Sequence, residues 1–338
     1  MRKFLIALLI LLAGFGLFLW YAAGPAISTG DFSSSGLLQF AATPETASSP
    51  SAPKEIKVLT YNIGYASGEK NNLAVSLSRA EVESNLGAMA SSLKELKPDV
   101  VCLQEVDFQA SRTFRINQME YLSKALSLPY GAYVVTWNKR YLPWPYWPLQ
   151  HQFGRIVSGQ AILSRFPIEK HEIKKFPKPA SNPFWYNWFY LERILEKLTL
   201  RIGNREVFLW NVHLEAFDPK ARLTQAAALA DWVQEEKSLF RIVAGDFNSV
   251  SQLKESLTEA ERQDVEDVGE SLKLLGEKTG LRNAESTTPF FTMPSWDPFK
   301  KIDHIFYDPK GFRLNAVGTL KALKASDHLP VWAVFRIQ

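Results

Sequence analysis

The chain has 338 residues, of which 46% are hydrophobic and 22% are charged, so it can bury a large core. This composition excludes a disordered or collagen-like chain. Its single cysteine, Cys102, excludes an internal disulfide framework and any zinc or iron–sulfur site built from cysteines. A metal ion would have to be bound by oxygen or imidazole ligands.

The charge balance argues against a protein held to nucleic acid by bulk charge. The formal net charge is +4, but Arg2 and Lys3 precede an apolar run, and the remainder carries 37 basic and 35 acidic residues. So weak an excess leaves room only for a local basic face.

The N-terminal segment is predicted to cross a membrane. Phe4–Ala23 form 20 consecutive residues without a charged or strongly polar side chain, enough for a hydrocarbon core of about 30 Å at about 1.5 Å per residue. Because basic residues precede this segment and none follows before Lys54, the positive-inside rule places the N-terminus in the cytoplasm and the rest outside. The alternative is a cleaved signal peptide, whose apolar stretch usually has about 7 to 15 residues, and cleavage would give a secreted protein.

Three regions are expected along the chain. Residues 1–23 form the transmembrane signal anchor, and residues 24–54, rich in Ser, Ala, Thr, Pro and Gly, have too little apolar pattern to become ordered. We therefore expect a flexible linker over 24–54. Residues 55–338 contain no repeat and no second low-complexity break, which predicts one folded domain.

Strands and helices alternate in this domain. Strands are predicted, in chain order, at Ile56–Tyr61, Val100–Leu103, Gln160–Leu163, Leu195–Ile202, Val207–Val212, Phe240–Ala244, Ile302–Tyr307 and Pro330–Ile337. One helix begins after Ser78, which forms a capping box with Glu81, and ends near Leu96. A second begins after Asp218, with Pro219 in its first turn. The pattern predicts an α/β fold, in which ligand sites lie where strands end.

Polar residues gather where these predicted strands end. The segments are Tyr61-Asn62, Gln104-Glu105, Asn211-Val212-His213, Gly245-Asp246-Phe247-Asn248, Lys301-Ile302-Asp303-His304 and Ser326-Asp327-His328. Taken singly, Glu105 could be a solvated strand end, Asp246 could begin a turn, and His213 could be a core histidine. Asp303 differs, because a carboxylate inside an apolar strand needs a partner or a shifted pKa.

Together these side chains form a set suited to the hydrolysis of a phosphate ester. Oxygen ligands for a hard divalent cation are available from Asn62, Glu105, Asp246, Asn248 and Asp327, which favours Mg²⁺ or Mn²⁺ over Zn²⁺. His328 could act as a general base if a carboxylate fixes its tautomer, and Asp303 is the natural partner. His213 could donate a hydrogen bond to the charge that develops on the phosphoryl group.

Seven ordered motifs resemble a known family. They are LTYNIG (59–64), DVVCLQEVD (99–107), SGQAILSRFPI (158–168), WNVHLEA (210–216), IVAGDFNS (242–249), KIDHIF (301–306) and ASDHLPV (325–331). The pattern resembles the metal-dependent endonuclease/exonuclease/phosphatase superfamily, which includes deoxyribonuclease, apurinic endonucleases, neutral sphingomyelinases and inositol polyphosphate 5-phosphatases. The motifs span essentially the whole predicted domain.

The resemblance implies a four-layer α/β sandwich, with two mixed β-sheets packed face to face and flanked by helices, here preceded by the transmembrane helix. It implies that Glu105 is the main Mg²⁺ ligand, with Asn62 beside it, and that Asp327 joins the metal or water shell. One departure is His304, where an aromatic residue such as tyrosine is more usual. Because His304 alternates away from its neighbour along the strand, we expect it to pack.

Catalytic roles are also implied by the resemblance. Asp246 matches the residue that positions or activates the attacking water, and Asn248 matches its phosphate-binding neighbour. His328, paired with Asp303, matches the other member of the base machinery. His213 is similar to the phosphate-stabilising histidine of the deoxyribonuclease and sphingomyelinase branches, whereas apurinic endonucleases commonly carry tyrosine there.

Two aromatic loop segments bear on the substrate, Trp137–Trp147 and Phe184–Tyr190. They could fold back on the core, or they could form an interfacial rim, because Trp and Tyr prefer the headgroup layer of a bilayer. The rim interpretation predicts a membrane-anchored, Mg²⁺-dependent phosphoesterase that acts on a phosphodiester or phosphomonoester, with a phospholipid headgroup as substrate and the lipid bilayer as partner. No obligate protein partner is evident.

Two alternatives remain open. An exported nuclease would use a set of lysines, Lys174, Lys175, Lys178, Lys300 and Lys301, together with aromatic rings that stack on bases. The near-neutral charge and the predicted export argue against it. A non-catalytic membrane scaffold would be expected to lack at least one of Glu105, Asp246, Asp303 and His328, but all four are present.

Overall fold

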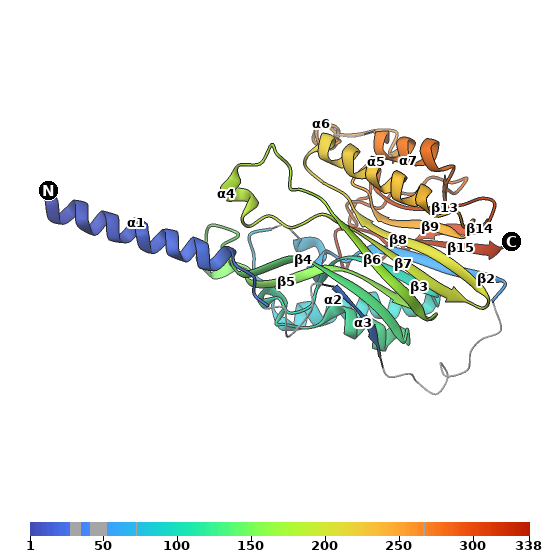
Figure 1. The fold of residues 1–338 in the computed structure, drawn as a ribbon, viewed down its shortest axis with the longest axis horizontal. Helices are drawn as coiled ribbons and strands as arrows, with labels where there is room; N and C mark the ends of the chain where they lie inside the picture. The colour runs from blue at the N-terminus through green and yellow to red at the C-terminus, as the bar shows by residue number, and fades with distance from the viewer. Residues whose placement is uncertain (28–34, 41–52, 72, 266–267) are drawn as a thin grey trace.

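Two mixed β-sheets lie face to face at the centre of the protein (Figure 1). The computed structural model describes residues 1–27, 35–40, 53–71, 73–265 and 268–338. In spatial order the first sheet consists of β1 (Ser35–Gln39), β4 (Tyr130–Leu142), β5 (Gly154–Ser164), β3 (Val100–Asp107), β2 (Glu55–Asn62), β15 (Val331–Ile337) and β14 (Phe312–Thr319). The second consists of β11 (Arg282–Asn283), β13 (Asp303–Tyr307), β9 (Arg241–Asp246), β8 (Arg205–His213), β7 (Ile194–Ile202) and β6 (Ile168–Lys175).

Helices flank both sheets. The α-helices of the described residues are α1 (Arg2–Ala23), which does not cover a sheet, α2 (Arg79–Leu96), α3 (Gln118–Leu126), α4 (Phe184–Asn187), α5 (Pro219–Glu235), α6 (Glu259–Gln263) and α7 (Glu270–Thr279). Short 3₁₀ turns lie at Gly64–Ala66, Gly68–Lys70, Ser111–Thr113 and Leu149–His151, and a two-stranded ribbon joins β10 (Gln252–Leu253) to β12 (Lys300–Lys301). Side chains of α2 and α3 pack on the outer face of the first sheet, and those of α5 and α7 on that of the second.

The main core lies between the two sheets. Fully buried side chains there include Val58, Cys102, Leu198, Leu209 and Ile305, contributed by five different strands. Each large apolar side chain buried in this way contributes about 1.5–3 kcal/mol of stabilisation. The order of helices, sheet, sheet and helices confirms the predicted four-layer α/β sandwich.

The two predicted helix starts are present. Ser78 and Glu81 form the capping box before α2, with Glu81 N donating to Ser78 Oγ at 3.2 Å and Ser78 N donating to Glu81 Oε2 at 2.7 Å. Asp218 Oδ1 accepts from Ala221 N at 2.9 Å before α5. In each case a side chain satisfies a first-turn N–H group that the helix itself leaves unpaired.

Several strands were not predicted. Residues 137–142 of the expected aromatic loop belong to β4, so the prediction of a loop from Trp137 to Trp147 is wrong over its first half. β6 and β14 lie at sheet edges with most of their residues exposed or half-buried. Such strands need no apolar run, because only one face or one end meets the core.

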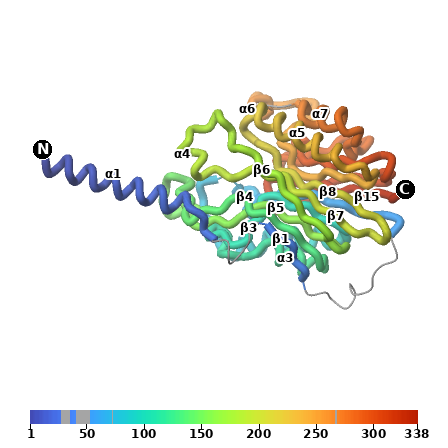
Figure 2. Tube along the Cα trace, in the orientation of Figure 1, coloured from blue at the N-terminus to red at the C-terminus, as the bar shows by residue number. Residues whose placement is uncertain are grey.

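Helix α1 projects away from the sandwich, as Figures 1 and 2 show. Among the described residues it is the one helix long and apolar enough to cross a membrane, and its most apolar stretch is not buried in the protein. A signal sequence would meet the same criteria of length and composition. The predicted apolar segment is therefore helical and unburied.

The prediction of a flexible linker over 24–54 is wrong for Ser35–Gln39. These residues form β1, which pairs antiparallel with β4 at the edge of the first sheet. Main-chain hydrogen bonds to an edge strand do not require an apolar sequence pattern, although Leu38 and Phe40 also pack against the core beneath α2 and α3. The linker residues 28–34 and 41–52 lie outside the described residues.

Candidate active site

Two parallel strand pairs place the site. β2 pairs parallel with β3, and β8 pairs parallel with β9. Within each pair, the carboxyl ends of the two strands therefore lie side by side. Asn62 ends β2 opposite Gln104, and His213 ends β8 opposite Asp246. β13 adds Asp303, which also lies opposite Asp246 in the antiparallel pairing with β9. Polar groups from both sheets therefore meet at one end of the sandwich.

Glu105 lies on an irregularity in β3. Its φ is 53°, and the pairing of β3 with β5 shifts register between Leu103 and Val106. This bulge leaves the Glu105 side chain 17% exposed, while Gln104 and Val106 beside it are fully buried. A positive φ at a non-glycine residue costs free energy, and here it accompanies a carboxylate turned toward the site.

Two glycines permit the close packing around the carboxylates. At Gly64, with φ +49°, a Cβ would lie 2.8 Å from Asp327 Oδ1. At Gly245, with φ +152°, a Cβ would lie 2.0 Å from the carbonyl oxygen of Val212 in β8. A larger residue at either position would displace a site carboxylate or separate β8 from β9.

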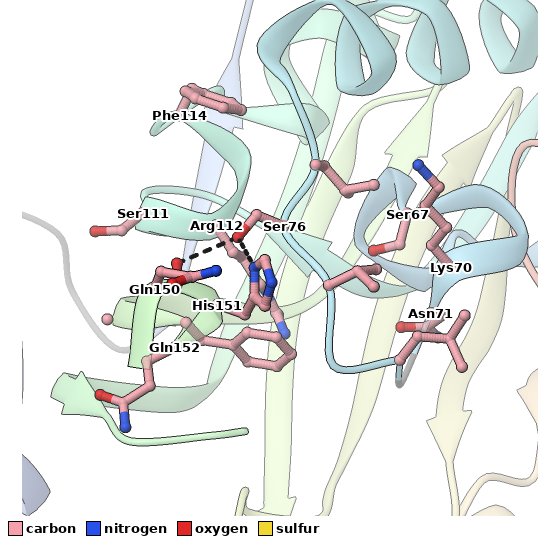
Figure 3. Close-up of a pocket in the computed structure, with 15 residues that line it drawn as sticks. Ser67, Lys70, Asn71, Ser76, Ser111, Arg112, Phe114, Gln150, His151 and Gln152 are labelled. Carbon is pink, nitrogen blue, oxygen red and sulfur yellow. Dashed lines mark hydrogen bonds between the residues drawn. The ribbon is translucent and has the colours of Figure 1, made fainter. Parts of the chain in front are cut away.

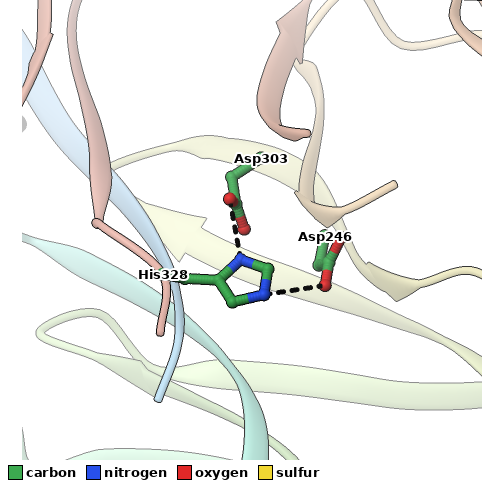
Figure 4. Close-up of side chains that lie close together, drawn as sticks. All are labelled: Asp246, Asp303 and His328. Atoms are coloured by element: carbon green, nitrogen blue, oxygen red, sulfur yellow. Dashed lines mark hydrogen bonds and ion pairs between the residues drawn. The ribbon is translucent and has the colours of Figure 1, made fainter. Parts of the chain in front are cut away.

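A histidine bridges two buried carboxylates, as Figure 4 shows. His328 Nδ1 lies 3.0 Å from Asp303 Oδ2, and His328 Nε2 lies 3.8 Å from Asp246 Oδ2. Since a carboxylate only accepts, Nδ1 carries the hydrogen toward Asp303. The predicted pairing of His328 with Asp303 is therefore present, and it supplies the partner that the buried Asp303 needs.

The charge state of this centre follows from its burial. Burial alone would lower the pKa of His328, but the Asp303 and Asp246 carboxylates raise it well above its ordinary value. Burial raises the pKa of Asp246, and the neighbouring His328 opposes that shift. The geometry thus favours a protonated imidazole held between the two carboxylates.

His213 approaches the same carboxylate from the other side. Its Nε2 lies 3.6 Å from Asp246 Oδ2 and 3.9 Å from Glu105 Oε1. Burial lowers the pKa of His213 well below its ordinary value, and the positive charges of Arg193 and His328 lower it further. A neutral His213 retains one N–H group that can donate to a substrate oxygen.

A second pair of carboxylates, those of Glu105 and Asp327, converges on the side chain of Asn71. Asn71 Nδ2 lies 3.2 Å from Glu105 Oε2 and 3.1 Å from each carboxylate oxygen of Asp327. Burial, with Asp327 adding to it, raises the pKa of Glu105 to about 7. Crowded carboxylates of this kind are stabilised by a cation, and their oxygen donors fit a hard divalent ion. The donor set therefore fits the divalent metal that the sequence predicts.

The Asp246, Asp303 and His328 centre could also hold a metal ion. One ligand atom from each of these residues lies within 4.8 Å of the others, and all three side chains are buried. Oδ1 of Asp303 has no hydrogen-bond partner among the described residues. The structure thus contains two neighbouring groups of side chains that could bind a metal. One consists of Glu105 and Asp327, and the other of Asp246, Asp303 and His328.

The two predicted asparagines both bind Asp246. Asn62 Nδ2 donates to Asp246 Oδ2 at 3.0 Å, and its Oδ1 accepts from Gly64 N at 3.0 Å. Asn248, with φ 48°, donates its backbone N–H to Asp246 Oδ1 at 2.9 Å and its side-chain amide to the carbonyl of Leu214 at 3.0 Å. The metal-ligand role of Asn62 and the phosphate-binding role of Asn248 stay predictions.

All eight residues predicted for the site therefore lie at this end of the sandwich, while His304 packs elsewhere. His304 Nε2 lies 3.1 Å from the carbonyl of Ser249, and its ring lies 5.6 Å from that of Phe247.

The sequence does not predict the place of Asn71 in this site, where it contacts Glu105 and Asp327. It lies in a polar loop outside every motif, and nothing in its local sequence marks it.

A buried amide pair connects the sheets behind the site. Gln104 Nε2 donates to Asn211 Oδ1 at 2.6 Å, which joins β3 of the first sheet to β8 of the second. Asn211 Nδ2 in turn lies 3.1 Å from Glu196 Oε2 and 3.2 Å from the carbonyl of Leu103. Because each buried polar group has a partner, this bridge can fix how the two sheets align.

A cavity of about 390 Å³ opens beside the carboxylates (Figure 3). Its wall includes Asn71, which contacts Glu105 and Asp327, and it extends to Arg112 and His151. Arg112 is held in an ion pair with Asp107, and its guanidinium lies 3.5 Å from the ring centre of Tyr65. Ser76 Oγ lies 2.7 Å from His151 Nδ1 on the far wall. The cavity can accommodate a substrate group next to the candidate metal site.

Solved structures share this fold. An endonuclease/exonuclease/phosphatase family protein from Bacteroides thetaiotaomicron is 18% identical with a TM-score of 0.58, covering 85% of this chain and 99% of its own. A mannosyl-6-phosphatase from the same species is 17% identical with a TM-score of 0.54, covering 83% and 99%. Humanized TDP2 of D. rerio is 16% identical with a TM-score of 0.50, covering 84% and 99%. No curated protein matches the chain.

The family assignment rests on the sequence as well as on the fold. The model of the Endonuclease/Exonuclease/phosphatase family matches residues 59–328, which is most of the chain and includes every predicted site residue. Members of this family are divalent-metal-dependent hydrolases that act on phosphate ester bonds. The chain belongs to the Endonuclease/Exonuclease/phosphatase family and is a hydrolase of phosphate esters.

Proposed function

We propose that the protein is a membrane-anchored, Mg²⁺-dependent phosphoesterase that cleaves a phosphodiester or phosphomonoester of a phospholipid headgroup by attack of water. One observation carries the proposal. The crowded carboxylates of Glu105 and Asp327 lie near the Asp303, His328 and Asp246 centre, and both carboxylates contact Asn71, which lines an open cavity. A charge-neutralising site and a proton-transfer site thus adjoin a space for the substrate.

The metal would be held by Glu105 and Asp327, with Asn62 beside them. All of these donors are oxygen atoms, which favours Mg²⁺, or Mn²⁺, over softer metals. When bound, the ion supplies positive charge at the phosphoryl oxygens. It would also offset the burial and the charge of Asp327 that together raise the pKa of Glu105.

The remaining chemistry is assigned to side chains of the chain itself. Asp246, held by Asn62 at 3.0 Å, orients the attacking water and accepts its proton, and the protonated His328 beside it stabilises the Asp246 carboxylate that does so. Asp303 fixes the ring of His328 through Nδ1 at 3.0 Å. His213 donates its N–H to an oxygen of the substrate phosphate, where negative charge grows in the transition state.

The surface supports lipid over nucleic acid. Trp147 is 76% exposed and Phe184 is 71% exposed, so neither aromatic segment folds back fully on the core. The basic residues that a nuclease could use are already engaged. Lys174 pairs with Glu235, Lys175 and Lys178 pair with Glu192, Lys300 pairs with Asp264, and Lys301 is buried.

An exported nuclease is the second candidate, since the same exposed rings could stack on single-stranded bases. Its distinguishing property is salt dependence. Binding to nucleic acid weakens steeply as salt is added, whereas insertion of aromatic rings into lipid does not. A non-catalytic scaffold is opposed by the intact centre of Asp246, Asp303 and His328.

The test is hydrolysis by the full chain in mixed micelles with Mg²⁺, on sphingomyelin, phosphoinositides, single-stranded DNA, duplex DNA and RNA. We expect turnover of a lipid, and we expect chelation or His328→Ala to abolish it. Turnover of nucleic acid that falls steeply with salt would instead establish the nuclease. Rates on every substrate that are unchanged in His328→Ala would contradict both enzymes and favour the scaffold.

A further inference from the structure

The chain that leaves α1 is fixed to β4 rather than freely tethered. Asn138 Oδ1 accepts from the backbone N–H of Ala26 at 2.6 Å and of Ile27 at 3.2 Å. The backbone N–H of Arg140 donates to the carbonyl of Gly24 at 2.8 Å. These bonds join the exit of the helix to the outer end of β4. We call this set of contacts the joint.

Side chains of α1 itself extend the joint. The ring of Phe18 meets that of Tyr141 edge to face with centres 5.8 Å apart, and the guanidinium of Arg140 lies 5.1 Å from the ring centre of Tyr21. Lys139 Nζ donates to the last carbonyl of the helix at 3.0 Å. The direction of α1 is thereby set relative to the sandwich.

Six exposed aromatic side chains lie at the same end of the molecule as the joint. We call them the aromatic rim: Trp144, Tyr146, Trp147, Phe184, Trp185 and Trp188, each between 43% and 76% exposed. The first three follow β4, and the others lie in and beside α4, which Figures 1 and 2 place near the base of α1. Exposed apolar groups gathered in this way mark an interaction surface.

The two parts of the rim are attached to one strand. Trp137 Nε1 in β4 donates to the carbonyl of Phe189 at 2.7 Å. The backbone N–H of Glu192 donates to the carbonyl of Thr136, also in β4, at 2.8 Å. The strand that holds α1 through the joint therefore also holds the segment that carries α4.

The composition of the rim suits the polar–apolar boundary of a bilayer. Residues 142–150 and 183–191 contain no charged side chain. Trp and Tyr rings favour the headgroup layer, where an apolar ring and a polar edge are both satisfied. A protein partner is not needed to explain the patch if α1 is retained as a membrane anchor, because the bilayer that it would cross then lies beside the patch.

The chain leads directly from one part of the rim into the wall of the cavity beside the candidate active site. The cavity wall includes Gln150–Gly154, which directly follow Trp144–Leu149 in the chain. The opposite wall includes Asn71, which contacts Glu105 and Asp327. The chain that carries the first part of the rim therefore goes on to line the cavity, and the cavity adjoins the candidate metal site through Asn71.

We infer that the joint and the aromatic rim form one membrane-seating surface, which holds the cavity against the headgroup layer of the same bilayer that α1 crosses. The occupant of the rim is the lipid interface, and the substrate enters the cavity from that leaflet. This inference rests on the proposed function in one respect, namely that α1 is retained as a membrane anchor.

The test uses cysteines introduced at the surface, which is possible because the chain has a single native cysteine. Because Cys102 is buried, a cysteine introduced on the surface can be labelled selectively with an environment-sensitive fluorophore. Three variants of the full chain are labelled: Trp147→Cys in the rim, Leu9→Cys within α1, and Lys273→Cys on α7 as the control. Each is reconstituted into phosphatidylcholine vesicles containing phosphatidylglycerol, without nitroxide lipids, with lipids that carry a nitroxide near the headgroup, and with lipids that carry one deep in the acyl chain.

We expect the nitroxide lipids to quench the Trp147→Cys label several-fold more than the Lys273→Cys label. Equal quenching of the two labels, with the α1 label still quenched by nitroxides placed deep in the chains, would overturn the seating surface and leave the anchor intact. Loss of quenching at the α1 label would overturn the anchor, and with it both this inference and the membrane part of the proposed function.

The joint has its own matched pair of variants. Asn138→Ala leaves the N–H groups of Ala26 and Ile27 without their acceptor, whereas Asn138→Asp keeps an acceptor oxygen at that position. We expect Asn138→Ala to shift the joint toward its detached state by about tenfold, and so to weaken quenching of the rim label, while Asn138→Asp retains it. Hydrolysis of soluble bis(p-nitrophenyl) phosphate should be equal in both variants. Equal rim quenching in Asn138→Ala and Asn138→Asp would exclude an orienting role for the joint.

Discussion

The two sheets of the sandwich are built around the same local unit, and they supply different chemistry. In the first sheet the chain runs from β2 through α2 to the parallel strand β3, and in the second it runs from β8 through α5 to the parallel strand β9. Each unit has a helix on its outer face and carries a carboxylate in the last residues of its second strand, Glu105 near the end of β3 and Asp246 at the end of β9. The units therefore place equivalent groups at the same end of the protein.

What surrounds each carboxylate differs. Glu105 lies near a second carboxylate, Asp327, and its pKa rises to about 7 because burial and the charge of Asp327 outweigh the opposing effects of His328 and Asn71. Asp246 lies between two imidazoles, His213 and His328, and accepts from Asn62. The first surroundings favour a metal ion and the second favour proton transfer. One scaffold thus serves two roles according to the residues that loops bring to it.

Removal of the imidazole from the second site should have the largest effect. For His328→Ala we expect the turnover number to fall by about 10²–10⁴-fold, because a positioned acid–base group contributes that much. Metal affinity, measured by calorimetric titration, should change little. A loss of metal affinity comparable to the loss of turnover would show that Asp246, Asp303 and His328 form a metal site. The two sheets would then not supply different chemistry.

The reciprocal change is Glu105→Gln. It keeps the shape of the side chain and removes the charge, so we expect metal affinity to fall by at least about 10–100-fold, the scale for weakened ligand shells. Activity should recover in part at high Mg²⁺. The matched control is Asp246→Asn, for which added Mg²⁺ should restore little. Equal rescue of both variants would mean that the two carboxylates act alike.

Asp303→Asn should have a smaller effect, because Asp303 acts through His328. We expect activity to fall by about 10–100-fold. Since Asp303 is a cause of the raised pKa of His328, its neutralisation should also lower that pKa. The proton resonances of His328 in a pH titration followed by NMR provide the check. An unchanged His328 titration would mean that Asp303 does not control the ring.

The smallest effect concerns stability in the absence of metal. The pKa of Glu105 is raised from its ordinary value of 4.5 to about 7, so the folded state binds this proton more tightly than the unfolded state does. Its contribution to stability is fully present below about pH 4.5 and is lost as the pH rises through about 7. Denaturant unfolding in chelator between pH 5 and pH 8 should show this loss. Glu105→Gln should remove that part of the pH dependence, and a slope that persists in the variant would assign it to another group.

The sequence predicts most of the site because the relevant signals are local. Glu105, His213, Asp246 and their neighbours end apolar strands within recognisable motifs, and the caps before α2 and α5 are formed within four residues. The edge strands escape prediction because one face or one edge of each meets solvent, so their apolar pattern is incomplete.

Asn71 shows why the remainder of the site could not be predicted. Its contact with Asp327 joins residues 256 positions apart, and it depends on how a polar loop packs in three dimensions. The exposure of the aromatic segments is equally non-local. Their composition is compatible with a core or with a rim, and only the position of α4 and of the chain after β4 decides between the two.

The place of β15 in the first sheet bears on when this hydrolase can become active during synthesis. β15 is the final strand of the chain, yet it pairs with β2, and Asp327 and His328 immediately precede it. A nascent chain that stops before these residues can form β2, β3, β8 and β9 but lacks both the Asp327 carboxylate of the candidate metal site and the bridging imidazole of His328. Hydrolytic activity would therefore arise only after the ribosome has passed His328, by which time the earlier strands can already have paired.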